Sequence, residues 1–114
     1  MIGATAGSSV LLSCRTSPSR AVTHAEWDFR HHGADEPILV YDGSRIYNKR
    51  ANKYNVHCNL SLSICNLRIN RLQDSDAGEY QCYLNTNDRT FNFIYNLRII
   101  GTFTCCIGAG TCSL

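Results

Sequence analysis

The chain has 114 residues and a formal net charge of +2, and 18% of its residues are charged. This length fits one domain, and so small a net charge gives no reason to expect nucleic-acid or anionic-membrane binding. Seven cysteines are an odd and high number. Since the sequence lacks a Cys-x-x-Cys pair, an oxidising extracellular setting fits better than a zinc site.

The sequence lacks a recognisable targeting segment. Residues 1–4 have no basic and then apolar lead of a secretory signal, so we expect the chain to begin at the mature domain. The apolar runs are far shorter than the roughly 18 residues of a membrane helix. We therefore expect any membrane attachment to come from a segment beyond this chain.

Alternation of apolar and polar residues predicts the first strands. Residues 9–15 predict the second strand of the domain, with Val10, Leu12 and Cys14 pointing inward. After a serine-rich loop, residues 25–30 alternate strictly, so one face of this strand is apolar and the other is charged. The apolar face comprises Ala25, Trp27 and Phe29, and the charged face comprises Glu26, Asp28 and Arg30.

The middle of the chain predicts shorter elements. After a turn, residues 38–41 predict a short strand, and Asp42-Gly43 is a hairpin signal. The polar and basic stretch 44–53 allows only a weak edge strand near Ile46-Tyr47.

Four strands complete an all-β pattern. Residues 54–60, 63–71 and 80–84 predict three of them, and residues 91–99 predict the last with the cleanest alternation in the chain. Its apolar side comprises Phe91, Phe93, Tyr95, Leu97 and Ile99, and its other side comprises Asn92, Ile94, Asn96 and Arg98.

The run Asp-Ala-Gly-Glu-Tyr-Gln-Cys at 76–82 is the most informative motif, with Cys14 far upstream and Trp27 between the two cysteines. A cysteine pair on facing sheets, a tryptophan on their bridge and a tyrosine two residues before the second cysteine are hallmarks of one sandwich fold. The chain therefore resembles the immunoglobulin superfamily. The long interval between Cys14 and Cys82 resembles the variable type, which has two extra strands.

This resemblance implies a Greek-key β-sandwich of the V-set type at residues 1–100, two antiparallel sheets joined by a disulfide, and a tail at 101–114. It also implies that the Tyr80 hydroxyl bonds to backbone near Asp76, and that a basic residue pairs with Asp76. Lys53 is the first candidate for this basic residue, and Arg50 is the second. The implied structural core comprises Cys14, Trp27, Asp76, Tyr80 and Cys82.

Residues with catalytic or metal-binding chemistry do not form a recognisable pattern. His31 and His32 are adjacent, and His24 and His57 fall in other predicted elements. Neither a nucleophile motif nor a glycine-rich phosphate loop is present. We expect no enzyme activity, no cofactor and no metal.

The remaining cysteines leave their pairing open. Cys58 and Cys65 could bridge neighbouring strands, bond to tail cysteines, or stay as buried thiols. The tail, with Cys105, Cys106 and Cys112, has two interpretations. It is a stalk whose cysteines are available for dimerisation, or its Gly-Ala-Gly-Thr at 108–111 resembles an antigen-receptor joining segment, which would put the last strand near 111–114.

Fold and composition favour a recognition domain over other functions. The leading hypothesis is an extracellular domain of a cell-surface immune or adhesion receptor, which binds a protein ligand or forms a homodimer, with another immunoglobulin-like domain as the expected partner. In V-type domains the outer face of the tryptophan-bearing sheet is one binding surface. Here that face would present Glu26, Asp28, Arg30, Gln81, Tyr83, Asn92, Ile94, Asn96 and Arg98.

Two alternatives use other surfaces. An antigen-receptor-like domain would bind through end loops near 16–24, 42–50 and 83–107. A secreted module for microbial surface sugars would use the basic stretch 49–53. Asn59-Leu60-Ser61 is a glycosylation sequon, which would carry a glycan on Asn59 in a secreted protein.

Overall fold

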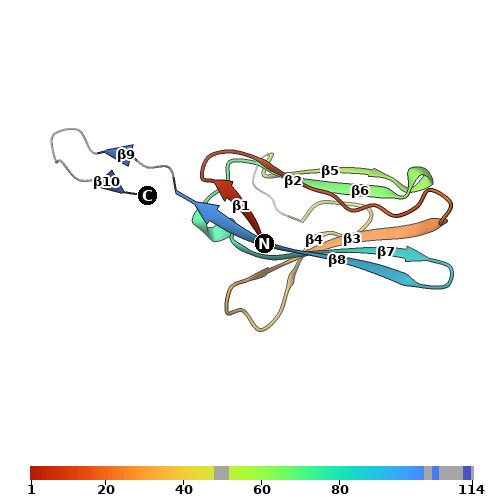
Figure 1. The fold of residues 1–114 in the computed structure, drawn as a ribbon. Coiled ribbons are helices and arrows are strands. Elements are labelled where there is room, and N and C mark those ends of the chain that lie inside the picture. Colours follow the sequence, from red (N-terminus) through yellow and green to blue (C-terminus); the bar gives the residue numbers. More distant parts are fainter. Residues whose placement is uncertain (48–51, 102–103, 106–111, 114) are drawn as a thin grey trace.

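A computed structural model describes residues 1–47, 52–101, 104–105 and 112–113. Two β-sheets face each other as separate layers (Figure 1). The first sheet has the order β1 (Ile2–Thr5), β8 (Thr90–Ile100), β7 (Gly78–Thr86), β3 (Val22–His31) and β4 (Ile38–Tyr41). The second has the order β2 (Val10–Leu12), β6 (Ile64–Ile69) and β5 (Tyr54–Asn59).

The five-stranded sheet is antiparallel except at its β1 edge. There β1 runs parallel to β8, with Ile2 opposite Leu97 and Thr5 opposite Ile100. The alternation predicted for the last strand is confirmed, because its predicted apolar side, Phe91, Phe93, Tyr95, Leu97 and Ile99, is buried or half-buried while the intervening residues are exposed. The strict period of two in the sequence therefore sets which face of this sheet meets the core.

The core lies between the sheets and is closed by a disulfide between Cys14 and Cys82, whose Cα atoms are 6.3 Å apart. The predicted inward residues of β3, Ala25, Trp27 and Phe29, are all buried. Burying such large apolar side chains is the main favourable contribution to folding.

The predicted strands form at the expected places, with different ends. The second predicted strand is shorter in the structure, where β2 covers only Val10–Leu12, although Arg15 adds one isolated bridge to Ile64. The weak edge strand near Ile46 is a single bridge to Tyr41. Arg50, the second candidate partner of Asp76, lies outside the described residues, and so do residues 49 and 51 of the basic stretch.

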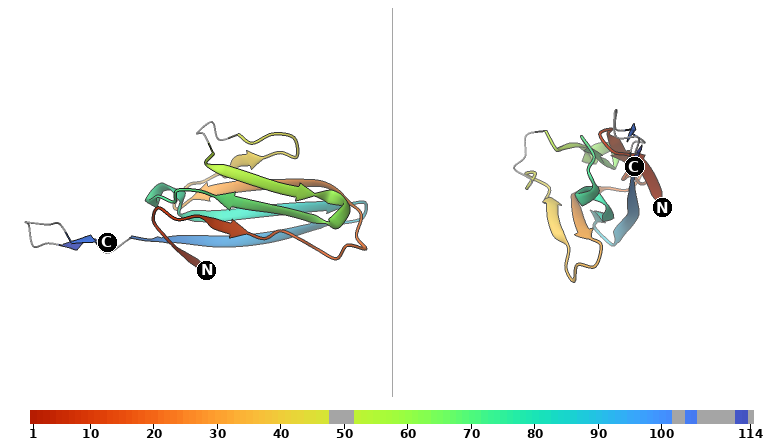
Figure 2. Two further views of the ribbon diagram at one scale, coloured as in Figure 1. Left: turned by 90° about the horizontal axis from the view of Figure 1, so that it is seen from above. Right: turned by 90° about the vertical axis from the view of Figure 1, so that its left-hand side faces the viewer.

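Two short strands follow the sandwich. β9 (Thr104–Cys105) and β10 (Cys112–Ser113) pair with each other, with Cys105 opposite Cys112, and they lie beyond the end of β8 (Figure 2). The joining-segment alternative needs the last strand of the sandwich near residues 111–114. In the structure β8 takes that position, between β7 and β1. Cys106 lies outside the described residues.

Two 3-10 helices connect the strands, η1 (Leu60–Leu62) between β5 and β6 and η2 (Asp74–Asp76) between β6 and β7. Within the described residues, none of the helices has the length and apolar character needed to cross a membrane.

Candidate protein-binding face

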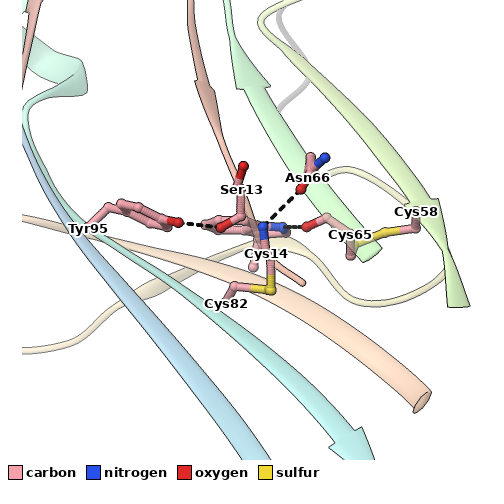
Figure 3. The surroundings of a disulfide bond; sticks show 8 residues. Ser13, Cys14, Cys58, Cys65, Asn66, Cys82 and Tyr95 are labelled. Carbon is pink, nitrogen blue, oxygen red and sulfur yellow. Dashed lines mark hydrogen bonds between the residues drawn. A yellow bond between two sulfur atoms is a disulfide. The ribbon is translucent and has the colours of Figure 1, made fainter. Parts of the chain in front are cut away.

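Hydrogen bonds and the Cys14–Cys82 disulfide connect the two sheets (Figure 3). The Trp27 Nε1 atom donates to the backbone oxygen of Cys65 at 2.9 Å, and the Tyr95 hydroxyl donates to the backbone oxygen of Ser13. Cys65 also forms a disulfide with Cys58, directly opposite on β5. Of the open alternatives for this pair, the structure shows the bridge between neighbouring strands.

A buried ion pair fixes the turn that leads into β7. The Lys53 side chain is only 2% exposed, and its Nζ atom donates to Asp76 Oδ2 and, at 3.0 Å, to the backbone oxygen of Asn70. The Tyr80 hydroxyl donates to the backbone oxygen of Asp76 at 2.8 Å. The interactions predicted for Lys53 and Tyr80 are thus both present, and Lys53 is not available to an external ligand.

The glycine of the 76–82 motif has a steric role at the start of β7. Gly78 has a φ of 152°, and a side chain there would collide with the backbone oxygen of Arg30 on the neighbouring strand. Glycine therefore allows β7 to approach β3 closely at this point. This close approach sets the register in which Glu79 lies opposite Arg30.

The structure brings the predicted binding residues together on the outer face of the five-stranded sheet. Three cross-strand rows follow from the register, with members contributed by β3, β7 and β8. The rows are Glu26–Tyr83–Asn92, Asp28–Gln81–Ile94 and Arg30–Glu79–Asn96, and Arg98 follows further along β8. We call this surface, including Arg98, the outer face.

Within the three cross-strand rows, apolar exposure is concentrated on one residue. Ile94 is 54% exposed, and Tyr83, in the neighbouring row, is half-buried. Asn92 and Asn96 flank Ile94 on β8 and are exposed. An apolar centre within a polar rim is the usual composition of a protein interface.

Two carboxyl groups lie next to each other on β3. The pKa of Asp28 is raised to about 7, first by burial and then by a hydrogen bond with Glu26 and the negative charge of Glu26. Within the described part of the chain, the Asp28 Oδ1 atom is buried without a hydrogen-bond partner. The pKa of the Tyr83 hydroxyl is also raised, first by burial and then by the negative charge of Asp28.

Shallow hollows open on both sides of Asp28. The first, of about 300 Å³, is lined by His24, Glu26, Asp28, Tyr83, Asn85 and Thr90. The second, of about 260 Å³, is lined by Asp28, Arg30, Asp35, Pro37, Glu79 and Gln81. Both hollows are small relative to sites for drug-sized ligands, so this face fits side chains of a partner better than a free small molecule.

Sequence reasoning missed some residues of this face. Glu79 forms an ion pair with Arg30 at 3.4 Å, and Leu39 of β4 lies opposite Asp28. Glu79 is two residues before Gln81 in the sequence, so extending the predicted strand toward its start would have placed Glu79 on the same face. Leu39 carried no such signal, because a bulge between Trp27 and Asp28 shifts the register of β4.

The end loops present a different surface. The guanidinium groups of Arg20 and Arg89 lie over the Phe91 ring, at 5.5 and 5.7 Å from its centre. His31 and His32 line a third hollow of about 200 Å³ at the opposite end of β3. In the described ranges, no three His, Cys, Asp or Glu side chains are grouped as a metal ion would require.

A family comparison agrees with this architecture. The model of the immunoglobulin V-set domain matches residues 2–100, from β1 to the end of β8. No curated protein matches the chain. V-set domains are typically non-enzymatic binding modules, and a disulfide-bonded V-set domain is typical of extracellular or cell-surface proteins. The matched range covers both sheets and the motif at 76–82, and the chain therefore belongs to the immunoglobulin V-set family.

Proposed function

We propose that this chain is the extracellular recognition domain of a cell-surface receptor and that it binds a protein partner through the outer face. The observation that carries the proposal is the half-exposed Ile94 in a row with Gln81 and the carboxyl group of Asp28. Exposing an isoleucine costs about 1–2 kcal/mol relative to burying it, which a partner would recover on binding.

The opposite sheet offers a surface that a glycan would cover. Asn59 is exposed at the end of β5, and its Oδ1 atom accepts a hydrogen bond from the Ser61 hydroxyl at 2.6 Å. A glycan on Asn59 would cover part of the three-stranded sheet and leave the outer face free. This arrangement supports binding through the outer face.

The basic stretch at 49–53 gives little support to binding of microbial sugars. Lys53 is buried against Asp76, and the basic residues before it lie outside the described residues. For the antigen-receptor alternative, β8 takes the position that a joining-type strand would need. A receptor domain with a fixed binding face is the function that these observations support best.

Two matched substitutions test the proposal. Ile94 on the outer face and Leu11 on β2 are 54% and 55% exposed, so an aspartate at either position changes a side chain of similar exposure. Tetramers of the chain would be applied to a panel of intact cells, including cells that display the chain itself. We expect Ile94→Asp to reduce staining at least about tenfold, and Leu11→Asp to leave it unchanged.

Circular dichroism would show that both variants fold. Staining that survives Ile94→Asp would place the binding surface elsewhere on the domain. An absence of staining on every cell type would contradict the proposal as a whole.

A further inference from the structure

The charges of the outer face are separated along its length. Glu26 and Asp28 lie at one end, and Arg98 lies at the other. Between them Arg30 and Glu79 pair with each other at 3.4 Å, so they largely neutralise each other. The face therefore has an acidic end and a basic end, with the apolar Ile94 between them.

The polar groups at both ends of the outer face are incompletely satisfied within the described part of the chain. Arg98 is exposed and, within the described part of the chain, forms no ion pair. At the acidic end Glu26 forms a hydrogen bond with Asp28 and its Oε1 atom lies 3.9 Å from His24 Nε2, while the Asp28 Oδ1 atom has no hydrogen-bond partner among the described residues. Each end therefore has unmet capacity for a charge of the opposite sign.

We propose that the partner of this face is a second copy of the chain, placed by a two-fold axis so that Glu26 of each copy pairs with Arg98 of the other. The proposal rests on the proposed function and deepens it, because it names the occupant of the outer face. In a two-fold contact the same surface of both copies is used. The acidic end of each copy therefore meets the basic end of the other, and both ends gain a partner of opposite charge.

The register gives the geometry of this contact. Glu26 and Arg98 are separated by two strand spacings, about 10 Å, across the sheet, and by six residues, about 20 Å, along the strands. The proposed two-fold axis lies in the plane of the contact. It passes through the midpoint of the line from Glu26 to Arg98 and is perpendicular to that line, so rotation about it exchanges the two positions. The midpoint falls on β7 between Gln81 and Glu79, and Gln81 has Ile94 as its neighbour in the same row. The apolar residue therefore lies close to the centre of the proposed dimer.

Ionisation of the acidic end supports the same arrangement. The titratable groups around Asp28 come from β3, β7 and the loop before β4, while β4 itself contributes the uncharged Leu39. They are His24, Glu26, Arg30, Glu79, Tyr83 and Asp35. Because burial raises the pKa of Asp28 to about 7, Asp28 carries only part of a negative charge at neutral pH. The proposed pairing with Arg98 is therefore assigned to Glu26 and not to Asp28.

Charge reversal tests this pairing directly. We would measure the mass of the full 114-residue chain by analytical ultracentrifugation over a concentration series, with free thiols alkylated so that tail cysteines cannot link two copies. The wild-type chain should dimerise. Glu26→Arg alone and Arg98→Glu alone should each raise the dimer Kd at least about tenfold, since each places like charges together at both ends.

An equal mixture of the two variants should dimerise again. The arginine introduced at position 26 of one variant then meets the glutamate introduced at position 98 of the other, and the native pair forms at the second contact. Arg15→Glu, which makes the same change at an exposed position outside the outer face, should dimerise as the wild type does. Tryptophan fluorescence of the single Trp27 would show that each variant is folded.

A mixture that stays monomeric, or a wild-type chain that is monomeric at every concentration, would overturn the dimer. If cell staining were still lost in Ile94→Asp in that case, the proposed function would stand with a different protein as the partner. If neither dimer nor Ile94-dependent staining were found, both proposals would fail.

Discussion

Asp28 shows how one residue can depart from what its sequence position suggests. The alternation of residues 25–30 places Asp28 on the outward face of its strand, and the structure agrees. Alternation says nothing about depth, however, and the Asp28 Oδ1 atom is buried. Burial depends on residues that are far away in the sequence, such as Leu39 and Gln81 on the two neighbouring strands.

The raised pKa of Asp28 predicts a pH dependence of stability. The folded state holds the proton up to about pH 7, whereas the unfolded chain releases it near the ordinary pKa of 3.8. The folded chain therefore binds more protons between these values, and its free energy of unfolding should fall as pH rises from about 4 to about 7. After discounting for solvent screening, we expect a fall of about 1 kcal/mol.

Urea unfolding at a series of pH values would measure this effect. Asp28→Asn should remove the decrease and be more stable than the wild type at pH 8. Glu36→Gln, a change at an exposed acid that does not line either hollow beside Asp28, should keep the wild-type profile. A wild-type stability that rose through this pH range would contradict the assignment to Asp28.

Lys53 illustrates what a sequence motif can and cannot predict. The family resemblance implied a basic partner for Asp76, and position in the sequence favoured Lys53, which the structure confirms. The additional bond from Lys53 to the backbone oxygen of Asn70 was not predictable, because it depends on the path of the chain after β6. Buried charges are stable only when such extra hydrogen bonds satisfy them.

At the level of the elements, long alternating strands were predictable and short irregular ones were not. β3 and β8 each have enough residues for a period of two to be unmistakable. β1 has four residues and was not predicted, because its alternation is too brief to separate from chance and the strand that it pairs with is β8, near the other end of the domain sequence. Its place therefore depends on tertiary pairing.

The two disulfides should contribute differently to stability. Cys14 and Cys82 are 68 residues apart, and Cys58 and Cys65 are 7 residues apart. The loop-entropy relation gives about 4 kcal/mol for the longer loop and about 2 kcal/mol for the shorter one. We therefore expect Cys58→Ala with Cys65→Ala to remain folded at room temperature, with a lower urea midpoint than the wild type.

The paired change Cys14→Ala with Cys82→Ala should be the more damaging of the two. The same urea titration, followed by Trp27 fluorescence, would compare them, since Trp27 is buried and donates to the backbone of Cys65. A larger loss of stability from removing the Cys58–Cys65 disulfide would show that this disulfide does more than reduce the conformational entropy of the unfolded chain.

At the level of the whole molecule, fold and partner were predictable to very different degrees. One motif and two distant residues were enough to predict the sandwich, because a disulfide, a tryptophan packed on it and a tyrosine corner together are hallmarks of the immunoglobulin fold. The partner is not set by the fold. The evidence for it comes from the distribution of a few exposed side chains, Ile94 and Arg98 above all.

Position-specific cross-linking would test the central claim, that the outer face is the binding surface, most directly. A photoreactive phenylalanine analogue would replace Ile94 in one sample and the equally exposed Leu11 in another, and each chain would be irradiated on cells that bind the wild type. We predict a cross-linked product from position 94 and none from position 11, with twice the mass of the chain if the partner is a second copy. Products from position 11 alone, or equally from both positions, would contradict the account.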